Sequence, residues 1–316
     1  SSLLSVATNG ILDIEDVALF WTFQTIEPPM DELDELYIQM LLDSVDTSLK
    51  GGAFKNIQIH PPSSELDGYD LSGIGHVMLD GRFESRAMIQ ADQIIFGDDG
   101  NVLSFPEFEY LEDGTPSWSP NDVPFVVALP QGMPPQEGWP ILIYQHDLGM
   151  NAMSLFEFAH RYTEQKIAVV AMDAYLHGAR TPESKQDGDL YFDGTILALR
   201  DHLRQSTLDL MAFARFVRNG LAPLVKTYLY QQGTLHVGYK GLNITKVYFH
   251  GHGLGGLFGI PFLGLDSLVS RCALSMVGAP LIQLMLESED PRIHSLVAGF
   301  SDFNLDIPEH DLSPIY

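Results

Sequence analysis

The sequence predicts an α/β fold: a mostly parallel, doubly wound sheet preceded by a smaller, β-leaning N-terminal region. From about residue 120 onwards, short and continuously apolar runs alternate with segments whose apolar residues recur at helical spacing. Strands and crossover helices alternate in this way in parallel sheets. The first 120 residues instead hold short strand-like runs between turn clusters, with one amphipathic helix. We therefore divide the chain into residues 1–120 and 121–316.

In the N-terminal region, residues 16–25 have the β-branched and aromatic content of a strand. Residues 31–46 place their apolar side chains on one face of a helix, which Gly51 and Gly52 end. Shorter strands are expected at 54–60, 77–79, 93–96 and 105–110.

In the second region, the apolar runs predict strands at 123–129, 141–145, 167–172, 246–250 and 273–277. Helical periodicity predicts helices at 154–165, 201–219 and 254–263. The apolar helix-like stretch 281–286 and an acidic break then lead into the C-terminal residues.

The charge of the chain limits its partners. It carries 42 acidic and 17 basic side chains, a formal net charge of −25. Such a surface repels phosphate backbones and anionic lipids, so nucleic acid is not an expected partner. No apolar run approaches the roughly 20 residues of a membrane span, and no cofactor is predicted. The single cysteine, Cys272, lies in an apolar run, which predicts a buried and inert thiol.

Three loop motifs follow three of the predicted strands. After the 246–250 strand and before a helix comes Gly251-His252-Gly253-Leu254-Gly255-Gly256. After the 141–145 strand comes His146-Asp147-Leu148-Gly149, and after the 167–172 strand comes Asp173-Ala174-Tyr175-Leu176-His177-Gly178-Ala179-Arg180. A strained strand–turn–helix flanked by small residues is the setting of a nucleophile elbow, G-x-S-x-G, and the first motif matches it except at the serine.

With these motifs, residues 120–280 resemble the α/β-hydrolase superfamily, in particular secreted or surface-exposed bacterial lipases and esterases. The resemblance implies an α/β-hydrolase core, with His252, Gly253 and Leu254 at a vestigial elbow. It also implies that residues 146–149 form a vestigial oxyanion loop and that the protein is extracellular or at the bacterial cell surface.

Two departures argue against the activity that this resemblance implies. Gly253 has no side chain to attack a carbonyl, and covalent acyl transfer needs an oxygen or sulfur there. Asp147 replaces the glycine of the oxyanion loop, where a carboxylate opposes the negative charge that the loop should stabilise. We expect Asp147 to lie close to Gly253 and to accept hydrogen bonds from the N–H groups of the elbow.

The late part of the core is not recognisable, since His294 and His310 are the only histidines after the elbow and neither follows a strand. We therefore expect no intact catalytic residue. We also expect no bound metal; the alternative is a metal site with His250 and His252 as ligands. Two hypotheses remain: a non-catalytic protein that serves binding or assembly, or a lipase or carboxylesterase seen as an inactivated or partial chain. The expected partner is a C-terminal fragment or further copies of the chain, which would complete the edge of the sheet.

Overall fold

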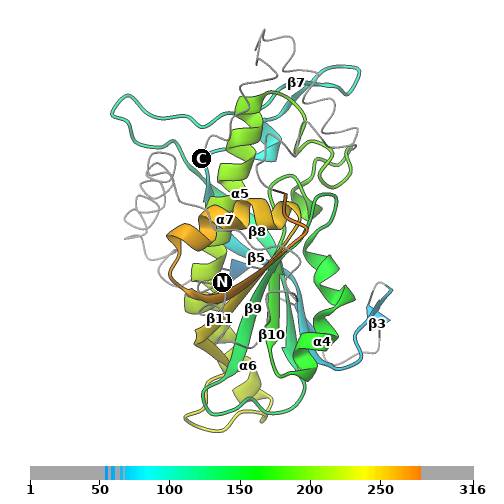
Figure 1. Ribbon diagram of the computed structural model, residues 1–316, viewed down its shortest axis with the longest axis vertical. Coiled ribbons are helices and arrows are strands. Elements are labelled where there is room, and N and C mark those ends of the chain that lie inside the picture. The colour runs from blue at the N-terminus through cyan, green and yellow to red at the C-terminus, as the bar shows by residue number, and fades with distance from the viewer. Residues whose placement is uncertain (1–53, 56–57, 61–64, 67, 279–316) are drawn as a thin grey trace, which may run out of the picture.

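The structure, a computed structural model, describes residues 54–55, 58–60, 65–66 and 68–278. The predicted strand 16–25, the predicted helix 31–46, the stretch 281–286, His294 and His310 lie outside these residues. The described chain forms one eight-stranded sheet with helices on both faces, and two small two-stranded sheets (Figure 1).

The strands of the large sheet are β1 (Phe54–Lys55), β2 (Gln58–His60), β5 (Ile74–Ala87), β8 (Ser119–Pro130), β9 (Trp139–Gln145), β10 (Ala168–Met172), β11 (Leu242–His252) and β12 (Val269–Ser275). Their order is β1-β5-β8-β10-β9-β11-β12, with β2 also paired to β5. The neighbours β10, β9, β11 and β12 are parallel, whereas β8 is antiparallel to β10 and β5 is antiparallel to β8. The sheet is therefore mixed, with a parallel half that carries the three loop motifs.

The helices are η4 (Ala152–Glu157), α4 (Ala159–Glu164), η5 (Gly178–Arg180), α5 (Ile196–Phe216), the π-helix η6 (Val217–Leu221), α6 (Ala222–Gln231) and α7 (Leu254–Leu265), with the short η3 at Ala91–Gln93. The small sheets pair β3 (Glu65–Leu66) with β4 (Tyr69–Asp70) and β6 (Ile95–Phe96) with β7 (Val102–Ser104).

Alternation along the strands divides the core between the two faces of the sheet. Leu142 and Tyr144 of β9 pack with Leu155 and Phe156 on the η4 and α4 face. Ile141, Ile143 and their counterparts on β8 and β10 instead pack with Phe213 of α5 and Phe258 of α7. Neighbouring strand residues point to opposite faces, so a continuous apolar run is what a sheet covered on both faces requires.

The sheet runs across the predicted division at residue 120. That position falls inside β8, and β5, from the N-terminal side, pairs with β8 from Ile74 to Ala87. The sequence suggested only a three-residue strand at 77–79, because the apolar run ends at Leu79 and the alternation from Asp80 onwards sets polar residues against mostly small ones. Backbone pairing with β8 keeps this 14-residue strand continuous.

Three predicted elements need correction. The helix at 154–165 is divided into the 3₁₀ turn η4 and the short α4, with Phe158 between them. The helix at 201–219 begins earlier, at Ile196, and continues through η6 into α6, where Pro223 lacks an N–H for the helical ladder. Residues 105–110 form no strand, only an isolated bridge from Tyr110 to Pro116.

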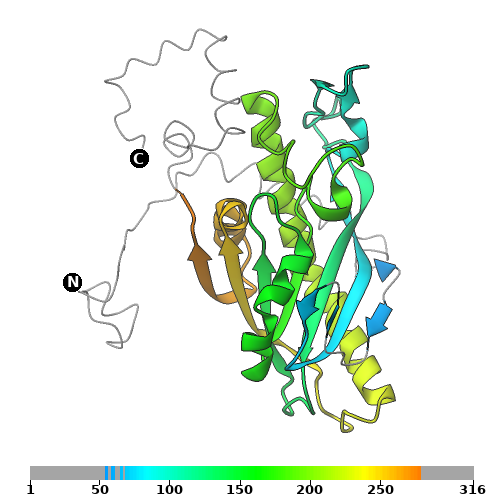
Figure 2. The same ribbon diagram turned by 90° about the vertical axis from the view of Figure 1, so that its right-hand side faces the viewer.

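The edge strand β12 is more exposed than its sequence suggests. Most of its residues, including Cys272, are exposed, so the prediction of a buried thiol is wrong. Among the described residues β12 pairs only with β11, and Figure 2 shows it at the border of the twisted sheet. An apolar run does not by itself distinguish a central strand from a border strand, because that depends on which elements pack against it.

Candidate functional site

The first loop motif forms the turn between β11 and α7. Gly253 has φ 50° and ψ −114° and is the N-cap residue of α7. This combination of positive φ and strongly negative ψ is sparsely populated by residues with a Cβ atom and costs them about 1–3 kcal/mol, whereas glycine adopts it readily. The motif therefore forms a strained strand-to-helix turn, with glycine at its apex.

Close backbone contact explains another small residue of this motif. A Cβ atom on Gly255 would lie 2.5 Å from the carbonyl oxygen of Gln145 and 2.6 Å from that of His146. Both oxygens belong to the backbone and cannot rotate away. The glycine therefore lets the start of α7 pack directly against the end of β9, and this brings the second loop motif to the turn.

The carboxylate of Asp147 fills the space above Gly253. Its Oδ1 accepts hydrogen bonds from the N–H groups of Leu148 and Leu254, each at 2.7 Å. One N–H comes from the loop after β9 and the other from the residue after the apex. The expectation that Asp147 lies beside the elbow and accepts from its backbone is confirmed.

This carboxylate also occupies the place of a side chain at position 253. A Cβ built on Gly253 would lie 1.9 Å from Oδ1 and 2.1 Å from Cγ of Asp147. Real Cβ atoms essentially never approach other atoms within 3.0 Å. Gly253 and Asp147 therefore form a matched pair: with Asp147 in this conformation, only glycine fits at the apex.

His146 anchors the Asp147 loop to the third motif. Its Nδ1 lies 2.8 Å from the Asp147 carbonyl oxygen, to which it donates, and its Nε2 accepts from the N–H of Ala174 at 3.1 Å. Burial, with a smaller effect of His177, lowers the pKa of His146 to about 3. The imidazole is therefore neutral at physiological pH, and both of its nitrogens are engaged in holding the two loops together.

The third motif is fastened by buried polar groups. The carboxylate of Asp173 accepts from the N–H groups of Ala152 and Ala179, at 2.8 and 3.0 Å. Burial raises the pKa of Asp173 to about 6 against the opposing effect of these two hydrogen bonds. These bonds join the loop after β10 to the start of η4, so Asp173 fastens its own loop.

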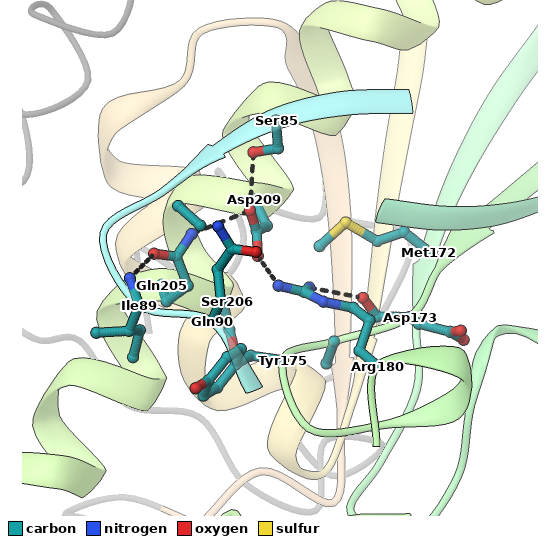
Figure 3. Close-up of polar contacts among 12 residues, drawn as sticks. Ser85, Ile89, Gln90, Met172, Asp173, Tyr175, Arg180, Gln205, Ser206 and Asp209 are labelled. Atoms are coloured by element: carbon teal, nitrogen blue, oxygen red, sulfur yellow. Dashed lines mark hydrogen bonds and ion pairs between the residues drawn. The ribbon is translucent and has the colours of Figure 1, made fainter. Parts of the chain in front are cut away.

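Arg180 ties the same loop to α5 through a buried ion pair (Figure 3). Its Nη2 lies 2.7 Å from Oδ2 of Asp209, and the two side chains are 6% and 0% exposed. Oδ1 of Asp209 accepts from Ser85 and Gln205, so strand β5 joins the network. A local signal for this pair exists in the sequence, since Asp209 is a charged residue between Leu208 and Leu210 on α5.

His250 and His252 do not form a metal site with other ligands. His250 Nε2 lies 3.0 Å from Ser275 Oγ, and His252 Nε2 lies 3.3 Å from Met276 Sδ. Burial, with a smaller effect of His252, lowers the pKa of His250. No group of three or more His, Cys, Asp or Glu side chains that could hold a metal occurs in the described residues.

The comparisons with known proteins concern the fold. No family model and no curated protein matches the chain. Among solved structures, the chain is similar to the acetyl xylan esterase from Paenibacillus sp. R4, at 14% identity and a TM-score of 0.47, over 90% of this chain and 74% of that chain. It is also similar to acetyl xylan esterase 1 from Thermoanaerobacterium sp. JW/SL YS485, at 14% identity and a TM-score of 0.42, over 92% and 74% of the two chains.

The chain's own features determine its fold. The strand order places β10 between β8 and β9, with β8 antiparallel to the parallel half. The strand β11, which lies next to the border strand β12, leads through a turn with positive φ at Gly253 into α7, and the loop after β9 faces that turn. A strand–turn–helix of this kind at the carboxyl edge of the sheet also occurs in the α/β-hydrolase fold. The described part of the chain is a mixed α/β sheet with helices on both faces.

Proposed function

We propose that this chain is a non-catalytic protein of the α/β-hydrolase fold, a pseudo-lipase or pseudo-esterase that serves binding or structural assembly. The observation that carries the proposal is the position of Asp147. Its carboxylate occupies the space of the missing nucleophile at Gly253 and takes up the Leu254 N–H. The glycine at position 253 and the aspartate at position 147 fit each other sterically. This is expected if both residues belong to one non-catalytic arrangement of the site.

The occupied N–H groups weaken the site for acyl transfer further. Oxyanion stabilisation depends on free donors aimed at the developing negative charge, and here two donors already share one carboxylate oxygen. A substrate oxyanion about 4 Å from this carboxylate would be repelled by about 4 kcal/mol at an effective dielectric constant near 20. His146, with both ring nitrogens engaged, does not supply a base at the turn.

The alternative is a bacterial lipase or carboxylesterase seen as an inactivated or partial chain. The retained geometry favours it, because the left-handed apex at Gly253 and the close contact at Gly255 still meet the requirements of an elbow. Under this hypothesis, a nucleophile at position 253 and an oxyanion loop without the Asp147 carboxylate would be enough to restore acyl transfer.

Activity assays distinguish the two hypotheses. We expect the purified chain to hydrolyse p-nitrophenyl acetate and butyrate no faster than buffer, and a fluorophosphonate probe to leave it unlabelled, since Gly253 offers no nucleophile. We expect the same of Gly253→Ser and of Gly253→Ser combined with Asp147→Gly, each checked for folding by circular dichroism. Labelling of the unmodified chain would overturn the proposal. Labelling of the double variant at residue 253 would favour the inactivated-esterase alternative.

For the binding role, we propose that the β12 edge pairs with another chain, either a C-terminal fragment or further copies, outside the cell or at the bacterial cell surface. Leu274 of β12 is 40% exposed and Met276 beside it is 81% exposed. An edge strand with apolar surface and unpaired backbone groups promotes pairing with other strands. None of the helices in the described ranges is long and apolar enough to cross a membrane.

Light scattering of the purified chain tests this pairing. We expect a mass above the 35.1 kDa of one chain, reduced to that of one chain by Leu274→Lys, because a charge on an edge strand discourages pairing. The matched control is Val237→Lys, which places the same charge at a loop position that is 84% exposed. A monodisperse single chain without a bound fragment would contradict the proposal, as would an equal loss of mass in both variants.

A further inference from the structure

A cavity of about 690 Å³ lies apart from the Gly253 turn, and no residue of the turn or of the Asp147 loop lines it. It lies between η3, the start of β8 and the loop after β10, which contribute Ala91, Asn121 and Tyr175. Its volume is within the range of small-molecule sites. The non-catalytic function proposed above gives it no role.

Tyr175, one of the residues that line this cavity, has a buried hydroxyl group without a partner. Tyr175 is 1% exposed, and its hydroxyl has no hydrogen-bond partner among the described residues. A buried polar group left unpaired costs about 1–3 kcal/mol, so such groups are rare unless a ligand or water satisfies them. Burial raises the pKa of Tyr175, and the hydroxyl therefore keeps its proton and is available as a donor.

The orientation of Tyr175 is fixed by its neighbours. The Arg180 guanidinium lies 5.5 Å from the centroid of the Tyr175 ring, and Figure 3 shows the two side chains together beside the Asp209 network. The ring also lies 5.3 Å from that of His202. Because Asp209 neutralises Arg180, that arginine positions the tyrosine rather than offering an unpaired charge to the cavity.

Arg82 supplies the unpaired positive charge. It lines the cavity, and its hydrogen bond in the described part of the chain is a long one, 3.4 Å from Nη1 to the carbonyl oxygen of Asp122. The Asp122 carboxylate is instead held by Lys55, at 2.9 and 3.0 Å. Asp92 and Glu183 also line the cavity but are exposed to solvent. The partly buried Arg82 is therefore not neutralised by an acidic side chain of the described residues.

We propose that this cavity binds a small organic carboxylate, whose carboxylate group pairs with Arg82 and whose oxygens accept a hydrogen bond from the Tyr175 hydroxyl. An arginine fork suits a carboxylate because two parallel N–H donors match its two oxygens. Ile94, Phe96 and Pro182 line the remaining wall and suit an apolar body attached to the carboxylate. The ligand class is thus an aromatic or short aliphatic monocarboxylate.

Calorimetric titration of the full chain with sodium benzoate and sodium hexanoate tests the proposal. We expect saturable binding of both, and at least tenfold weaker binding of benzamide, which keeps the ring but loses the charge. Inorganic phosphate distinguishes a carboxylate site from a general anion site, and we expect it to bind at least tenfold more weakly than benzoate. Two outcomes would overturn the assignment. One is that neither carboxylate binds at 10 mM, about the weakest affinity worth a specific site. The other is that benzamide or phosphate binds as tightly as benzoate.

Variants locate the binding to this cavity. Tyr175→Phe removes only the hydroxyl and keeps the ring under Arg180, and Arg82→Gln removes the charge together with the guanidinium fork. Each should weaken benzoate binding about tenfold or more, as expected for a hydrogen bond or ion pair to a charged ligand group. Arg86→Gln is the matched control, four residues further along β5 and outside the cavity, and should bind as the unmodified chain does. Unchanged binding by Arg82→Gln would exclude this site even if Tyr175→Phe failed to fold.

Discussion

Replacing Gly253 by serine should lower the free energy of unfolding by about 2–6 kcal/mol, because a side chain at the apex and the Asp147 carboxylate need the same space. The Cβ atom alone would lie 1.9 Å from Oδ1. Overpacking of this kind costs about 1–3 kcal/mol, and the strained backbone with positive φ adds about 1–3 kcal/mol for a residue other than glycine. Urea denaturation followed by circular dichroism measures the difference.

Gly233→Ser is a control at another glycine with positive φ, one where a side chain meets no steric clash. Gly233 also has a left-handed backbone, with φ 69°, but a Cβ atom there would meet nothing within 4 Å. This variant should therefore lose only the backbone part, about 1–2 kcal/mol. If Gly253→Ser loses no more than Gly233→Ser, Asp147 does not fill the apex.

A double-mutant cycle tests the pairing of Gly253 with Asp147 directly. Asp147→Gly leaves the N–H groups of Leu148 and Leu254 without their acceptor and should cost about 1–3 kcal/mol. Adding Gly253→Ser to this variant should cost less than it does in the unmodified chain, by about 1–3 kcal/mol, since the clash is gone. Simple additivity of the two losses would show that the two residues do not compete for space.

Replacing Asp209 by asparagine should cost about 3–5 kcal/mol, because it leaves the Arg180 charge buried without a counter-ion. The asparagine also presents an amide in place of a carboxylate that accepts from Arg180, Ser85 and Gln205. Thermal or urea unfolding measures the loss.

An exposed ion pair supplies the control for Asp209. Lys240 lies 3.0 Å from Glu137, with side chains that are 55% and 67% exposed. Glu137→Gln should therefore change stability by less than about 1 kcal/mol, since water screens such pairs. Combining Asp209→Leu with Arg180→Met removes both buried charges and should recover part of the loss. Equal effects of Asp209→Asn and Glu137→Gln would contradict the assigned role of the buried pair.

The local sequence pattern was sufficient to predict the parallel half of the sheet. The strands at 141–145 and 167–172 agree with β9 and β10 to within two residues at each end, because a strand buried on both faces needs an unbroken apolar run. The glycines at 251, 253 and 255 predicted a tight strand–turn–helix, since the backbone geometry of such a turn excludes larger side chains.

Pairing and packing across the chain decided the rest. The long strand β5 exists because β8 provides backbone partners over most of its length, and the exposure of Cys272 depends on the position of β12 at the border of the sheet. Gly253 and Asp147 stand out in the sequence as unusual residues, and their positions in two neighbouring loops predicted that they would meet. Only the tertiary structure showed that one Asp147 oxygen accepts from two N–H groups and that the carboxylate excludes a Cβ atom at 253. The juxtaposition of Arg82 with Tyr175 had no local signal, because they are 93 positions apart in the sequence (175 − 82) and only the folded chain places both at one cavity.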